Sequence, residues 1–217
     1  MASTIGTPFQ RARTAEQKQQ RWDAILAAAR RVALRSGVRD ATLAMIAEEV
    51  GLAPSNVLRY FGTREEIYLQ LLGDAWNEWS QELERSLEGV TPGAAAIASV
   101  VSRTLCERPL LCDLVAYIGP SFEYNVSVDA VRRMTLLGRE RVKTFSILFT
   151  GLLSVTEEDA FDLYVALFAF TGNLWMRSHP SEEVAAVYGP EGAGIAFGPM
   201  LQRMVQTFID GLLTQSN

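Results

Sequence analysis

Apolar side chains recur along most of this chain at the three- and four-residue spacing of one helix face, whereas the alternation typical of half-buried strands is absent. Gly37 follows the first such segment, and glycine is common just beyond the last residue of a helix. The pattern therefore predicts an all-α fold whose first helix covers about residues 17–36. The apolar face of this helix is formed by Trp22, Ile25, Leu26, Ala29, Val32 and Ala33.

Helix start and stop signals divide the remaining sequence. Thr42 is suited to cap a short helix, and Pro54 is suited to begin the next one because the first helical turn needs no N–H. Thr63 followed three residues later by Glu66 is a capping-box pattern before a long helix. A loop with glycine and proline is expected at 178–197. About nine helices are predicted, the later ones at 43–50, 54–61, 64–87, 92–106, 109–119, 127–150, 157–177 and 198–214.

The second and third predicted helices enclose the turn Gly51-Leu52-Ala53, and this arrangement fits a helix-turn-helix unit. In such a unit the second helix places its N-terminal residues in the major groove of DNA. Here that helix carries four side chains suited to hydrogen-bond bases or phosphates, namely Ser55, Asn56, Arg59 and Tyr60. From the residues alone, a polar face that meets only water is an equal alternative.

The segments from Ala41 to Leu52 and from Tyr60 to Ile67 closely resemble the signature of the tetracycline-repressor (TetR) family. The matching features are a threonine before the second helix, the I-A-x-x-x-G core, an aromatic residue followed by phenylalanine, and a basic–Glu–Glu–aliphatic start of the fourth helix. The resemblance covers about residues 17–70, and beyond them the chain is similar only in length and helical pattern.

The resemblance implies a transcriptional regulator, usually a repressor, that binds double-stranded DNA. It divides the chain into a flexible arm at 1–16, a DNA-binding domain at 17–64, and a ligand-binding and dimerisation domain at 65–217. Thr42 would cap the second helix and touch a phosphate, and Arg64 takes the place of a phosphate-binding basic residue. The implied DNA contacts are Thr42, Pro54, Ser55, Asn56, Arg59, Tyr60 and Arg64.

Two positions depart from the family pattern. Leu58 stands where the family usually has a phosphate-binding tyrosine, and Ala53 stands where a serine or threonine usually caps the third helix. These departures keep open a second interpretation, in which the chain is a helical interaction protein of the same fold with lost or weak DNA binding.

The predicted helix at 157–177 is apolar on nearly every side, so we expect one side to pack inward and the other against a second subunit. A single thick monomer core is the alternative. In a homodimer, two DNA-binding units about 34 Å apart would read a near-palindromic operator. In the family the last two helices form the dimer interface, which here implies Tyr164, Phe168, Leu201, Met204, Val205, Phe208 and Leu212.

Aromatic and methionine side chains gather in the predicted helices between residues 64 and 177. Apolar cavities with few polar groups bind small molecules, and the resemblance implies a pocket here for a small-molecule effector. We expect an apolar or aromatic ligand, although ordinary core packing is the alternative for each side chain. The expected lining residues are Trp76, Trp79, Tyr117, Phe122, Met134, Phe145, Phe149 and Trp175.

Charge is divided unevenly along the chain. The net charge is −5, yet residues 1–60 hold nine basic and five acidic side chains, which gives +4 there and −9 in the remainder. This division is typical of a basic, DNA-binding end on an acidic carrier, although a difference of this size also arises by chance.

No catalytic or metal-binding constellation is evident. The only histidine, His179, lies beside no nucleophile motif, and with Cys106 and Cys112 it provides too few ligands for a structural zinc. The glycine-rich segment 189–194 has neither a preceding strand nor a following Lys-Ser/Thr, as a phosphate-binding loop would. We therefore expect no enzyme and no cofactor. Without a signal peptide or a membrane-length apolar run, we expect a cytoplasmic protein with no membrane partner.

Overall fold

The fold consists of α-helices, and the computed structural model describes residues 8–121, 125–188 and 195–215. Ten helices and no strand lie within these ranges, which confirms the all-α prediction. The helices are α1 (Pro8–Ser36), α2 (Leu43–Glu49), α3 (Pro54–Val57), α4 (Arg64–Leu87), α5 (Ala94–Cys106), α6 (Pro109–Ser121), α7 (Val128–Leu153), α8 (Glu157–Ser178), α9 (Glu182–Tyr188) and α10 (Phe197–Gln215).

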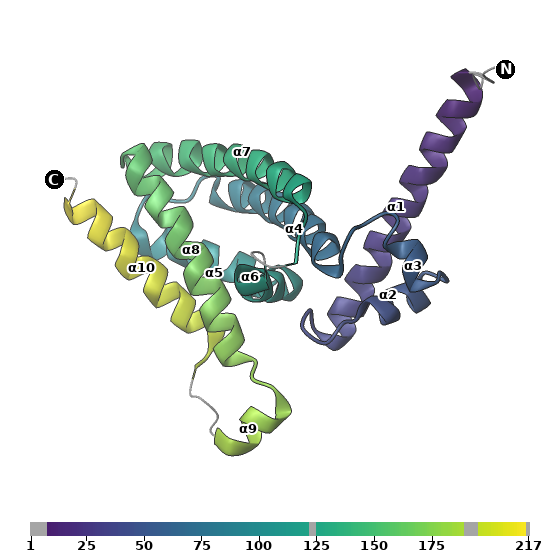
Figure 1. Cartoon of the computed structure of the whole chain (residues 1–217). Helices are drawn as coiled ribbons and strands as arrows, with labels where there is room; N and C mark the ends of the chain where they lie inside the picture. The colour runs from purple at the N-terminus through teal and green to yellow at the C-terminus, as the bar shows by residue number, and fades with distance from the viewer. Residues whose placement is uncertain (1–7, 122–124, 189–194, 216–217) are drawn as a thin grey trace, which may run out of the picture.

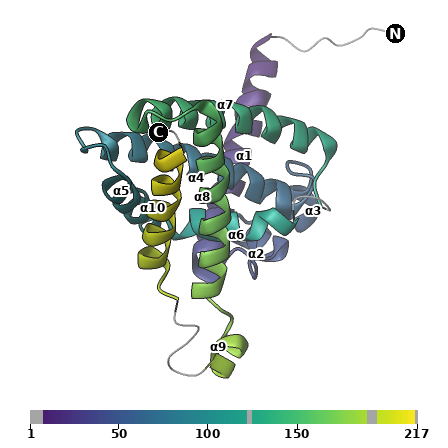
Figure 2. The same cartoon turned by 90° about the vertical axis from the view of Figure 1, so that its left-hand side faces the viewer.

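Figure 1 shows a small head of α1, α2 and α3 at one end of the molecule, which α4 joins to a larger body. The body contains α5 to α8 and α10, with α8 and α10 side by side in both Figure 1 and Figure 2. Helix α9 projects from the lower side of the body. None of the helices in the described ranges is long and apolar enough to cross a membrane.

Three elements differ most from the sequence prediction. Helix α3 ends at Val57 and not at residue 61 as predicted. Helix α1 begins at Pro8, so residues 8–16, which were predicted to belong to a flexible arm, continue the helix instead. Pro8 suits the first helical position, and no glycine or second proline interrupts the polar residues after it. Helix α9 lies in the predicted loop. Its Val184, Val187 and Tyr188 have helical spacing but are all exposed, and the glycines and prolines around them favoured a loop.

Side-chain caps form at the helix starts that the sequence indicated. The hydroxyl oxygens of Thr42 and Thr63 accept hydrogen bonds from the backbone N–H groups of Met45 and Glu66, at 3.2 and 3.1 Å. Helix α3 follows Ala53 and has no side-chain cap, as the departure at this residue predicted. The weak start and the length of only four residues make α3 dependent on packing for its position.

The buried side chains form one continuous core that passes from the head into the body. In the head, Ile25, Val57 and Phe61 are buried, and the rings of Trp22 and Phe61 stack with centroids 3.8 Å apart. Helix α4 contributes to both parts, since its N-terminal Ile67 and its C-terminal part are both buried. The head is therefore attached to the body by a shared core helix rather than by a flexible linker.

Candidate DNA interface and the junction between head and body

The α2–α3 pair has the geometry of a helix-turn-helix unit. Gly51 adopts a φ of +69°, which L side chains rarely adopt, and this allows the tight turn after α2. The N–H of Leu52 then donates to the carbonyl of Ala47 at 2.8 Å, while Ile46 and Val57 are buried between the two helices and α1. Burial of these apolar residues leaves the polar side of α3 facing outward.

The outward side of α3 presents Pro54, Ser55, Asn56 and, just beyond its end, Arg59, all of them exposed. Tyr60 is only half exposed and packs against the core. Within the described residues, the side chains of Ser55, Asn56 and Arg59 make no hydrogen bond or ion pair. Their donors and acceptors are therefore all available to an external partner. Leu58, which replaces the usual tyrosine, is also exposed and offers no polar group.

Thr42 combines two roles at the start of α2. Its hydroxyl oxygen accepts the N–H of Met45, which caps the helix as predicted. A hydroxyl group can accept and donate at the same time. Because Thr42 is exposed, its O–H remains available to donate to a phosphate oxygen.

Arg64 lies in a place that the sequence did not indicate. Its side chain is only 24% exposed and reaches back from α4 to the turn between α1 and α2. The guanidinium donates to the carbonyl of Ala41 at 3.3 Å, to the carboxylate of Glu65 at 3.0 Å and to the hydroxyl of Tyr117 from α6. These contacts do not support the expected phosphate contact, because they use the guanidinium inside the molecule. Tyr117 is distant in sequence, so no local pattern indicated its contact with Arg64.

Two further hydrogen bonds hold the α1–α2 turn against the body. The Val38 N–H donates to the carboxylate of Asp113 in α6 at 2.7 Å, and the Tyr68 hydroxyl donates to the Ala41 carbonyl at 2.6 Å. Burial raises the pKa of Tyr68, so this hydroxyl stays protonated and remains a donor. We call this set of contacts, together with those of Arg64, the junction.

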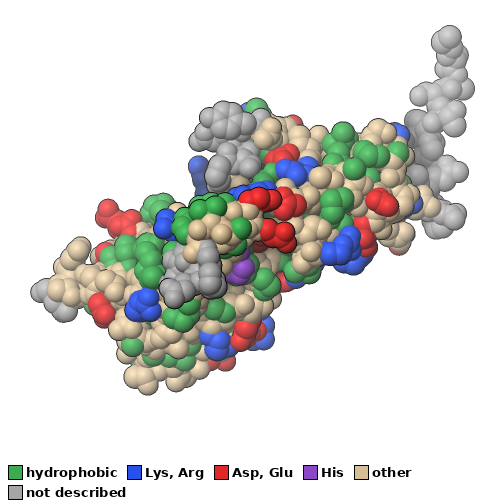
Figure 3. All heavy atoms as spheres, turned by 90° about the horizontal axis from the view of Figure 1, so that it is seen from below, with side chains coloured by type: hydrophobic (Ala, Val, Ile, Leu, Met, Phe, Trp, Pro, Cys, Tyr) green, Lys and Arg blue, Asp and Glu red, His purple; other side chains and the backbone are tan. Residues whose placement is uncertain are grey.

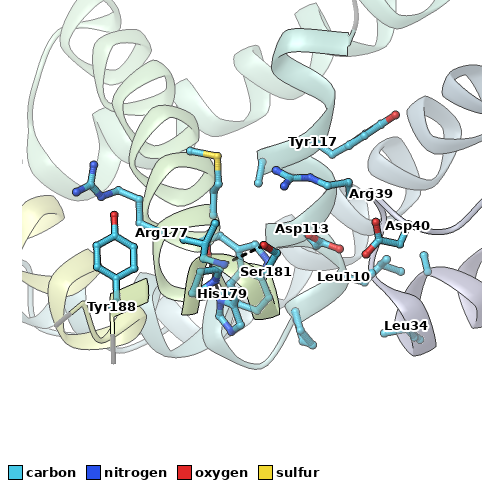
Figure 4. Close-up of a pocket in the computed structure, with 18 residues that line it drawn as sticks. Leu34, Arg39, Asp40, Leu110, Asp113, Tyr117, Arg177, His179, Ser181 and Tyr188 are labelled. Atoms are coloured by element: carbon cyan, nitrogen blue, oxygen red, sulfur yellow. Dashed lines mark hydrogen bonds between the residues drawn. The ribbon is translucent and has the colours of Figure 1, made fainter. Parts of the chain in front are cut away.

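A cavity of about 640 Å³ lies beside the junction. Figure 4 shows Arg39 and Asp40 on its head side, and His179, Ser181 and Tyr188 on the side of α8 and α9. Tyr117 and Trp175, two of the residues expected to bind an effector, line it as well. The lining includes basic and acidic side chains, and Figure 3 likewise shows both kinds interspersed on the face seen from below. The cavity therefore indicates no preference for a charged ligand of either sign.

The other residues expected to line a pocket lie mainly in the body core. Trp76, Trp79, Phe145 and Phe149 are each 5% exposed or less. The rings of Phe145 and Phe149 stack with centroids 4.2 Å apart, and Trp76 meets Trp79 edge-on at 4.7 Å. Met134 is half-buried on α7, and Phe122 lies outside the described residues. The predicted set is thus divided between this aromatic core and the junction cavity.

Three of the seven residues expected at a dimer interface are covered by the chain's own helices. Leu201, Val205 and Leu212 are 0%, 1% and 7% exposed, because α10 packs against α5 of the same chain. The expectation that these three contact a second copy is therefore corrected. Tyr164 and Phe168 are half-buried and contact Trp76, with ring centroids 5.4 and 4.3 Å away, and their place at a dimer interface stays a prediction.

The outer sides of α8 and α10 nevertheless carry apolar side chains. Met204 and Phe208 are half-buried, whereas Phe161 and Val165 of α8 are 46% and 49% exposed. A helix that is apolar on both sides gives no indication of which side faces inward, so the sequence pattern missed Phe161 and Val165.

Comparisons with known proteins agree with this geometry. Residues 74–216 match the family described as "Tetracyclin repressor-like, C-terminal domain", and residues 25–71 match "Bacterial regulatory proteins, tetR family". No curated protein matches the chain.

Several solved structures share the fold. The fatty acid degradation regulator FadR from Bacillus halodurans superposes with a TM-score of 0.58 at 12% identity, covering 88% of this chain and 96% of that one. The multidrug binding protein EbrR, complexed with imidazole, gives 0.55 at 15% identity, covering 87% and 94%. RolR in complex with resorcinol gives 0.55 at 16% identity, covering 90% and 95%. At such identities the likeness shows the fold alone.

The family match to residues 74–216 spans more than half of the chain, and the match to residues 25–71 covers the helix-turn-helix unit. The resemblance predicted from the sequence is thereby confirmed, and so is the expectation that the chain is not an enzyme, because this family is non-enzymatic. The chain belongs to the TetR family of DNA-binding transcriptional regulators.

Proposed function

We propose that this regulator is a cytoplasmic homodimeric repressor, which binds a near-palindromic operator and is released from it by a small apolar or aromatic effector. The observation that carries the proposal is the outward side of α3, where Ser55, Asn56 and Arg59 are exposed and unpaired within the described residues. Asparagine can pair with adenine through two hydrogen bonds, and arginine can pair with guanine or bind a phosphate. Thr42 and Tyr60 supply hydroxyl groups for the phosphates on either side of α3.

The dimer is supported by the outer surface of α8 and α10. Phe161 and Val165 leave nearly half of their surfaces in water, and the half-buried Met204 and Phe208 extend the apolar area. Exposed apolar surface of this kind is typical of a protein contact, and a two-fold dimer would cover the same surface on both copies. Two heads on one scaffold also bind DNA far more tightly than one, because the second binding event is intramolecular.

Release by an effector is supported by the rigid attachment of the head. The junction fixes the α1–α2 turn to α6 through Asp113 and Tyr117, so a change in the body alters the orientation of α3. An effector shifts this balance only by the difference in its affinity for the two arrangements. The fold relatives RolR and EbrR were solved with resorcinol and imidazole, both small ring compounds, and this supports a ligand of similar size here.

Selection of DNA from a random pool by the full-length protein tests the proposal. We expect an enriched sequence of two inverted half-sites, and binding that weakens steeply as salt is raised. Asn56→Ala should relax the base preference at one position of each half-site, a loss of about 1–3 kcal/mol there. Gln81→Ala, which removes an exposed amide side chain of α4, is the control and should change nothing. A failure to enrich any sequence would favour the alternative, an interaction protein that has lost DNA binding.

A further inference from the structure

The aromatic core of the body contains a buried hydrogen-bond donor that finds no acceptor in the described part of the chain. This donor is the indole Nε1–H of Trp76, a residue that is 3% exposed. The neighbouring Trp79 shows the usual arrangement, since its indole N–H donates to the hydroxyl of Thr104 at 3.0 Å. Buried polar groups almost always have a partner, so an unpaired one requires an explanation.

A second donor group lies near Trp76. Arg141 of α7 is half-buried, and its Nε donates to the side-chain carbonyl of Asn77 at 2.9 Å. No carboxylate in the described part of the chain forms an ion pair with this guanidinium, and burial lowers the pKa of Arg141. The acid that acts on it electrostatically, Asp74, is engaged by the side-chain amide of Gln70 at 3.0 Å.

The Trp76 indole N–H and the Arg141 guanidinium lie in the same region, between α4, α7 and α8. Asn77 follows Trp76 in α4, and Tyr164 of α8 both meets the Trp76 ring edge-on and acts electrostatically on Arg141. Gly73, one turn earlier in α4, makes room for the guanidinium: a Cβ there would lie 2.8 Å from an Arg141 terminal nitrogen. Burial raises the pKa of Tyr164 to about 12, which keeps its hydroxyl protonated and able to donate.

The helix that carries Arg141 has no buried residue in its middle part. The buried residues of α7 are Ala130, Phe145, Phe149 and Leu153, so none lies between residues 131 and 144. A segment with few buried apolar contacts opens at a lower free-energy cost than the core around it. For a ligand to enter here, this part of α7 would move away from Gly73 while Phe145 and Phe149 remain packed.

We propose that this place, between α4 and the N-terminal part of α7, is an effector subsite for an aromatic acid. The ring of the ligand packs among Trp76, Tyr164 and Phe168, whose own rings already stack or meet edge-on there. Its carboxylate accepts the Trp76 N–H and binds the Arg141 guanidinium, so the indole gains a hydrogen-bond acceptor and the guanidinium gains an ionic partner. This inference rests on the proposed function, because it assigns a chemical class to the effector. The junction cavity, with its mixed charges, makes no such selection.

Indole N–H signals in a ¹⁵N-labelled full-length protein provide the test. The chain has four tryptophans, and Trp→Phe variants assign their signals. The probes are 1-naphthoate, the neutral 1-naphthamide and the cationic 1-naphthylmethylamine. We expect 1-naphthoate to move the Trp76 signal downfield, while the Trp79 signal, whose N–H already has an acceptor, stays nearly in place. We also expect it to bind at least about tenfold more tightly than either of the other probes.

Arg141→Met should weaken 1-naphthoate binding about tenfold and leave 1-naphthamide unaffected. Arg139→Met, an exposed arginine on the same helix, is the matched control and should change neither probe. If Arg141→Met does not fold, Trp76→Phe gives a second test, because it retains a ring but removes the donor. Stronger binding of the amine, equal loss for acid and amide, or no binding of 1-naphthoate would each overturn the proposal. DNA selection without any probe tests the proposed function separately, so the two failures are distinguishable.

Discussion

The head and the body place their unpaired polar groups differently. In the head, Ser55 and Asn56 on α3 and Arg59 just beyond its end are exposed, and water satisfies them until DNA replaces it. In the body, the Trp76 N–H is buried and has no partner among the described residues, and the half-buried Arg141 forms no ion pair with them. An exposed polar group without a protein partner costs little free energy, because water satisfies it, and it suits a large, charged partner. A buried one costs more and selects a small ligand that supplies the missing acceptor. The following predictions test this division, from the largest expected effect to the smallest.

The packing under α3 should be the most sensitive part of the head. Phe61 is 2% exposed and stacks on Trp22, so Phe61→Ala should cost about 3–5 kcal/mol of folding free energy. DNA binding should be lost while the near-ultraviolet circular dichroism of the body aromatics remains. Denaturant unfolding followed by both signals measures this. Loss of both together would show that the body cannot retain its packing without the head.

The outer surface of α8 should determine the assembly state. Val165→Glu places a charge on each side of the proposed interface, and it should weaken dimerisation by about 1–3 kcal/mol because the carboxylate is desolvated there. Leu136→Glu on α7 is the matched control, since Leu136 is even more exposed, at 63% against 49%. Sedimentation velocity distinguishes the species. If Val165→Glu remained dimeric and Leu136→Glu became monomeric, the interface would lie on α7 instead.

Two arginines that are close in sequence should behave differently toward salt. Arg59 is exposed and unpaired, so Arg59→Gln should lower the slope of log affinity against log salt by about 1 for each phosphate that the variant no longer binds. Arg64→Gln should weaken DNA binding through misplacement of the head, with the slope unchanged, because Arg64 contacts Ala41, Glu65 and Tyr117. Tyr117→Phe, which removes only the hydroxyl at the junction, should likewise weaken DNA binding, by about 1 kcal/mol, with the slope unchanged. A reduced slope for Arg64→Gln alone would restore its role as a phosphate-binding residue.

The smallest predicted effect is an increase in the folding stability of the head. Ala53 gives α3 no side-chain cap, so Ala53→Ser should stabilise the head by about 0.5–1 kcal/mol through a hydrogen bond to a free N–H of the first turn. DNA affinity should rise slightly, because less α3 is frayed before binding. Ala95→Ser, an exposed position inside the first turn of α5, is the control and should give no gain. Differential scanning calorimetry provides the measurement.

The parts of the fold that depend on local signals could be predicted from sequence. Thr42, Gly51 and Thr63 each set a helix boundary through their own backbone or side-chain geometry, and the structure has those boundaries within about a residue. The missing side-chain cap at Ala53 could also be predicted, because capping depends on the side chain of that one residue.

What the sequence could not indicate are the contacts between distant residues. Arg64 was expected to face DNA, yet its partner Tyr117 lies in α6, and no periodicity reports that pairing. In the same way, Leu201 and Val205 were expected at a dimer interface, although α5 of the same chain covers them. An apolar residue at helical spacing is commonly buried, but the sequence pattern does not determine whether its own chain or a second copy covers it.

The participation of α4 in the head has a practical consequence for dissecting the protein. A fragment that stopped near residue 64 would lose Ile67 and Tyr68, both fully buried, and with them the hydrogen bond from Tyr68 to the Ala41 carbonyl. Such a fragment would expose apolar surface and lose the brace under the α1–α2 turn. An isolated DNA-binding fragment should therefore end no earlier than the second or third turn of α4. Apolar residues of α4 that the body normally covers should be replaced there by polar ones.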